Sequence, residues 1–87
     1  MKQATVADLA RRIEEVSRSS ALGPRVRQVE VEAEDSVEGG AFLRVLLHFE
    51  HPDELEWTQA EPLVRSIEDA VAELDERFPS VRFADAA

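Results

Sequence analysis

One group of residues in this sequence has the types and spacing of a metal site. His48 and His51 are its two histidines, and Glu50 and Asp53 accompany them. Imidazole and carboxylate groups are ligands for Zn²⁺ or Mn²⁺, and ligands at a strand end and in the next turn can converge on one ion. Histidines also occur in polar turns without any metal, and Pro52 sets the direction in which His51 points. We therefore expect an ordinary strand end, with no bound cofactor and no divalent metal.

The chain contains no sequence pattern typical of an enzyme. Its 19 acidic residues offer many proton donors and acceptors, but catalysis requires a concave site that perturbs such groups. Ser-His-Asp patterns, phosphate-binding glycine loops and metallohydrolase motifs are absent, and Gly39-Gly40 is typical of a hairpin turn. The lack of cysteine excludes thiol catalysis and disulfides. We predict that the protein is not an enzyme.

Residues 41–49 predict a strand that is apolar on both faces. Its odd positions form an unbroken apolar row with a period of two, while Phe42 and Leu46 lie on the opposite face beside Arg44 and His48. A strand of this kind is usually central in its sheet, and its second face is usually covered. We predict that Phe42 and Leu46 form an association patch.

The preceding segment, residues 28–34, predicts a half-buried strand with Glu30, Glu32 and Glu34 on its polar face. This acidic row is either a docking surface for a basic partner or a solvated edge strand, where charge also discourages edge-to-edge aggregation. If residue 34 lies opposite residue 42 across the hairpin turn at 35–40, Glu32 faces Arg44.

Two helices should flank the hairpin. Thr5 begins a capping box before an apolar stripe, and Gly23-Pro24 ends that first helix. Thr58 has capping-box spacing to Glu61, which predicts that the second helix begins there. Trp57 is then either a hydrophobic staple at the helix start or an anchor for a partner.

The second helix should extend to Phe78, which is the last member of its apolar stripe. Its predicted start keeps Pro62 near the first turn, where a missing amide is tolerated. An earlier start at Asp53 would place Pro62 inside the helix. Pro79 should end the helix, and a short strand at 81–83 should follow.

This order of elements predicts a single α+β domain over residues 1–87. We expect a two-layer α-β-β-α-β sandwich, with both helices on one face of a three-stranded mixed sheet of order 1-2-3, as in a fragment of a ferredoxin-like fold. The face without helices should carry the three glutamates, Phe42, Leu46 and their polar neighbours Arg44, His48 and Arg82.

The formal net charge of −9 argues against nucleic acid and anionic membranes as partners, because both require a basic face. It favours a basic protein partner. The sequence has neither the ~18–20 apolar residues of a membrane span nor the core of a signal peptide. Together with the absence of cysteine, this predicts a cytoplasmic protein.

Three sequence features resemble the cytosolic C-terminal domain of cation diffusion facilitator transporters. They are the Glu-Asp-Ser-x-Glu-Gly-Gly turn at 34–40, the long second helix, and Glu76-Arg77-Phe78-Pro79 before the last strand. The resemblance covers residues 8–84, and no membrane part accompanies it. It implies a small helix-strand-strand-helix-strand unit that dimerises and contributes to metal sensing.

Three functional hypotheses follow from these observations. The first is a non-catalytic interaction module that forms a homodimer through the helix-free sheet face. Its interface candidates are Glu32, Phe42, Arg44, Leu46 and Trp57. The second is an accessory or antitoxin-like partner of a basic protein. The third is a metal-sensing domain that uses His48, His51 and Asp53.

Overall fold

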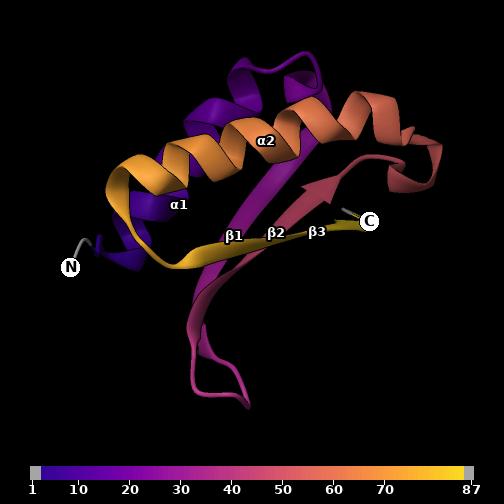
Figure 1. The fold of residues 1–87 in the computed structure, drawn as a ribbon. Helices are drawn as coiled ribbons and strands as arrows, with labels where there is room; N and C mark the ends of the chain where they lie inside the picture. The colour runs from indigo at the N-terminus through magenta and orange to yellow at the C-terminus, as the bar shows by residue number, and fades with distance from the viewer. Residues whose placement is uncertain (1–2, 86–87) are drawn as a thin grey trace.

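The computed structural model describes residues 3–85. It has two layers, in which two helices cover one face of a three-stranded sheet (Figure 1). Along the chain the elements are α1 (Val6–Ser19), the 3₁₀ turn η1 (Gly23–Arg25), β1 (Val26–Asp35), β2 (Ala41–Phe49), the 3₁₀ turn η2 (Pro52–Glu54), α2 (Trp57–Leu74) and β3 (Phe78–Asp85).

The sheet has the order β1-β2-β3, with β1 antiparallel and β3 parallel to β2. This arrangement confirms the predicted α+β class, the mixed sheet and the central position of the apolar strand. The sequence left the register open to a slip of two residues, and in the structure Glu34 lies opposite Phe42 and Glu32 lies opposite Arg44. One irregularity interrupts the β1–β2 ladder, between Val26 and Gln28.

The core lies between the sheet and the helices. Leu43, Val45, Leu47 and Phe49 of β2 are each 0% exposed, as the odd positions of the central strand should be. They belong to one hydrophobic cluster with residues from α1 and α2: Leu9, Ile13, Leu63, Ile67 and Val71. Burying each large side chain contributes about 1.5–3 kcal/mol, so this layer supplies most of the stability.

The start and end of α1 follow local chemistry. The Thr5 side chain accepts a hydrogen bond from the Asp8 amide at 3.1 Å, which satisfies one free donor of the first turn. After the helix, Gly23 is buried where a Cβ atom would lie 2.1 Å from the Arg18 carbonyl oxygen. Only glycine allows this close approach of two backbone segments.

The prediction that α2 begins at Thr58 is wrong, because its N-cap is Glu56 and its first residue is Trp57. Gln59 completes a capping box in which its side-chain oxygen accepts from the Glu56 amide at 3.3 Å. Pro62 therefore lies inside the helix. Pro62 lacks only the amide that would donate to the Thr58 carbonyl. Thr58 lies at the exposed helix start, where water can donate to this carbonyl instead.

The end of α2 also differs from the prediction, because the helix stops at Leu74 and Phe78 begins β3. Asp75 is the C-cap, and its extended backbone breaks the helix before the apolar spacing runs out. The last strand is longer than predicted and contains Pro79. Proline is tolerated there because β3 is an edge strand.

A buried ion pair lies at this junction. The Asp75 carboxylate accepts from Arg77 Nε at 2.9 Å and from Arg77 Nη2 at 2.6 Å. It also accepts from the Ala4 amide at 2.9 Å, and Arg77 Nη2 donates to the Ala4 carbonyl at 3.2 Å. The pair thus joins the segment before α1 to the α2–β3 connection.

No helix in the described part of the chain is both long and apolar enough to cross a membrane.

Candidate functional site: the helix-free sheet face

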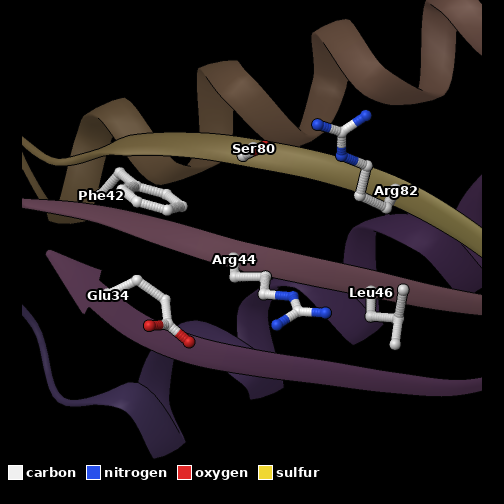
Figure 2. Close-up of a pocket in the computed structure, with 6 residues that line it drawn as sticks. All are labelled: Glu34, Phe42, Arg44, Leu46, Ser80 and Arg82. Atoms are coloured by element: carbon white, nitrogen blue, oxygen red, sulfur yellow. The ribbon is translucent and has the colours of Figure 1, made fainter. Parts of the chain in front are cut away.

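The side chains that alternate away from the core form the helix-free face of the sheet. Strand pairing arranges them in four rows across β1, β2 and β3: Glu34–Phe42–Phe78, Glu32–Arg44–Ser80, Glu30–Leu46–Arg82 and Gln28–His48–Ala84. Figure 2 shows six of these side chains in front of the sheet, with the helices behind it. The face contains the four sheet residues that we expected at an interface, Glu32, Phe42, Arg44 and Leu46.

Phe42 and Leu46 of β2 are the large apolar residues that line this face. Phe78 is the neighbour of Phe42 in the β2–β3 register and is 63% exposed, but it lines a separate depression beside Glu68 and Ala72 of α2. Phe42 and Leu46 are only partly buried. Large apolar side chains that share a solvent-facing sheet surface are typical of association sites.

Two arginines on the face differ from the others in the described residues 3–85. Six arginines there form ion pairs with carboxylates, and Arg25 donates to the carbonyls of Glu50 and His51. The six pairs are Arg11–Asp8, Arg12–Glu15, Arg18–Glu14, Arg27–Glu50, Arg65–Glu61 and Arg77–Asp75. Arg44 and Arg82 have no such partner among the described residues, although the chain carries nearly twice as many acidic as basic residues.

The carboxylates of the face lie along the opposite edge, on β1. Glu30 contacts His48 at 3.2 Å between Oε2 and Nε2, whereas Glu32 and Glu34 have no hydrogen bond or ion pair within residues 3–85. Negative charge therefore follows β1, and free positive charge lies on β2 and β3. This separation leaves both signs available to a partner.

The face is shallow. A depression of about 570 Å³ is lined by Glu34, Phe42, Arg44, Leu46, Ser80 and Arg82, and a smaller one of about 100 Å³ lies between Arg44 and the β1 glutamates. Both are open along the sheet, as Figure 2 shows for the larger one. Such a surface can bind carboxylates and apolar side chains of a macromolecule, but it does not enclose a small substrate.

The three predicted metal ligands do not form a common site. His48 lies on the helix-free face, where it contacts Glu30. His51 precedes η2 in the left-handed backbone conformation (φ 56°, ψ 60°), and its carbonyl accepts from Arg25. Asp53 belongs to η2. Within residues 3–85, no three His, Cys, Asp or Glu side chains are grouped so that they could hold a metal ion.

Trp57 does not belong to the helix-free face. It is the first residue of α2, which lies in the helical layer, and its side chain is 63% exposed. It is also not the residue before the helix cap. That position is held by Leu55, which packs against the core.

The sequence analysis did not assign Ser80 to the face and did not assign Phe78 to a strand. Phe78 continues the helical spacing of α2, so we assigned it to the core of the domain. The contrary signal was the alternation of Phe78, Ser80 and Arg82, which has the period of a strand. A strand that begins at residue 78 places Ser80 and Arg82 on one face.

Comparison with known proteins gives no relative: no family model, no curated protein and no solved structure matches this chain. The resemblance to the cation diffusion facilitator domain therefore stays a hypothesis based on sequence pattern.

Proposed function

We propose that this protein is a non-catalytic interaction module, cytoplasmic in location, that forms a homodimer through the helix-free sheet face. The observation that carries the proposal is the pair of partly buried side chains Phe42 and Leu46 on a face that no helix covers. A second copy would remove these side chains from water. It would also add a second apolar layer to a domain of 87 residues, a size at which one core is only marginally stabilising.

The ionisable groups support a role without catalysis. Within residues 3–85, the two groups with a clearly shifted pKa are Asp75 and Arg77. They pair with each other at a structural junction, and the Asp75 side chain is 0% exposed. The shifted groups are thus engaged in holding the fold, whereas a general acid or base must reach a substrate.

Sedimentation of three proteins tests the homodimer. Wild type should be a dimer at high micromolar concentration, and Phe42→Asp should be a monomer with unchanged helix content by circular dichroism. Val37→Asp is the matched control, because Val37 is fully exposed at the hairpin tip and away from the four rows. A monomeric wild type would refute the homodimer, and co-purification of a basic protein on the intact face would favour the accessory-partner alternative instead.

A further inference from the structure

The orientation of the two protomers follows from the charges of the face, provided that the homodimer proposed above is correct. A contact between two identical faces has a two-fold axis that lies in the plane of the contact. When two sheets pack with aligned strands, this axis runs either along the strands or across them. The two orientations bring different strands together.

An axis along the strands exchanges the two edges of the sheet. β1 of one protomer then faces β3 of its partner, and the two β2 strands face each other. An axis across the strands instead places β1 on β1 and β3 on β3. In that second orientation the row of Glu30, Glu32 and Glu34 meets the same row of its partner, and like charges in a contact are strongly unfavourable.

The row Glu30–Leu46–Arg82 distinguishes the two orientations most clearly. Its charges run from negative on β1, through an apolar residue on β2, to positive on β3. Exchange of the edges sets Glu30 opposite the second protomer's Arg82 and sets Leu46 opposite its own copy. Both ends of the row are then complementary, and the apolar residue meets an apolar residue.

The other rows do not add to this charge complementarity. Phe42 meets its own copy on the central strand. Arg44 also meets its own copy, but Glu32 is its neighbour in the β1–β2 register, so that the row Glu32–Arg44–Ser80 has no net charge. Glu30 Oε1 accepts from Gln28 Nε2 at 3.2 Å and Glu30 Oε2 contacts His48 Nε2 at 3.2 Å, and the two carboxylate oxygens together retain further acceptor capacity.

We infer that the protomers pack with β1 of each across β3 of the other, so that Glu30 and Arg82 form two symmetry-related ion pairs between the chains. The pairing explains why Arg82 has no partner within the described part of its own chain. The inferred occupant of the face is thus a second copy in a single orientation.

Charge reversal tests this orientation. Arg82→Glu alone sets two carboxylates against each other at both edges, and Glu30→Arg alone does the same with two guanidinium groups. Each variant should dimerise at least tenfold more weakly than wild type at low ionic strength. A mixture of the two variants should form a heterodimer of near wild-type affinity, because every opposed pair is then complementary. High salt should reduce the differences.

Arg12→Glu, on the exposed surface of α1, is the control, because it changes the net charge by as much as Arg82→Glu does. This variant should dimerise like wild type. If wild type dimerises and Phe42→Asp does not, but the mixture shows no preference for the heterodimer, the orientation is wrong and the homodimer stands. If wild type is a monomer, the homodimer itself fails.

Discussion

Arg77 forms an ion pair with the solvent-excluded carboxylate of Asp75. The Asp75 carboxylate also accepts from the Ala4 amide, and the Arg77 guanidinium donates to the Ala4 carbonyl. Ala4 and Asp75 are 71 residues apart in the chain. The Asp75 side chain would be an unpaired buried charge without these contacts, which is one of the most destabilising arrangements in a protein. The ion pair therefore links the N-terminal segment to the end of α2.

This pair should determine the acid stability of the fold. The hydrogen bond from the Arg77 side chain is the main cause that holds the pKa of Asp75 well below its usual range. A carboxyl group whose pKa is lower in the folded state stabilises the fold above its unfolded pKa of about 3.9. That contribution is lost as the pH falls from there towards the folded pKa.

We expect Asp75→Asn to lower the free energy of unfolding by about 3 kcal/mol at pH 7. The difference from wild type should shrink as the pH falls below about 4. Urea unfolding at a series of pH values measures both effects. Asp69→Asn, on the exposed surface of α2, is the control and should follow wild type throughout. If the difference in the free energy of unfolding between wild type and Asp75→Asn were the same at all pH values, the ionisation of Asp75 would not contribute to the stability of the fold.

The close approach of the Gly23 backbone to the Arg18 backbone should leave no room for a side chain at position 23. A methyl group there would lie 2.1 Å from the Arg18 carbonyl oxygen, so the backbone must move. We expect Gly23→Ala to lower the free energy of unfolding by at least about 2 kcal/mol. Thermal or urea unfolding would detect a loss of this size.

Gly40→Ala is the matched control for that substitution. The nearest atom to its added methyl group is Ser36 Oγ at 3.6 Å, an ordinary contact. The variant should therefore stay within about 0.5 kcal/mol of wild type. Equal effects of the two substitutions would show that the close approach at Gly23 is not what constrains the loop.

Zinc should not stabilise this fold. His48 and His51 belong to different local structures, and the described residues provide no group of three ligands. We expect the melting temperature of wild type, His48→Ala and His51→Ala to be independent of added zinc. A ligand that binds the native state must raise the melting temperature, so a rise that is confined to wild type would restore the metal-sensing hypothesis.

The hairpin and its two faces were predictable from the sequence, because local rules determine them. Alternation in 41–49 places its odd residues in the core, and side chains on a strand reach opposite faces in turn. A register that slipped by one would expose the core side of the strand, whereas a slip by two would keep both faces, so the alignment of residue 34 with residue 42 was decided by the structure. The pairing of two neighbouring strands is therefore enough to place Phe42, Arg44 and Leu46 on the same face as Glu32.

The tertiary structure decided where α2 ends and what the face contains. The apolar stripe of α2 fits Phe78 as well as Leu74, so spacing alone extends the helix. Asp75 stops it because its carboxylate is buried against Arg77 and Ala4, and the Ala4 contact is invisible to any local pattern. Phe78 thereby begins β3 and is 63% exposed, so it does not belong to the core. The isolation of Arg82 also depends on the assembled sheet, since pairing across strands determines which charges lie within reach of one another.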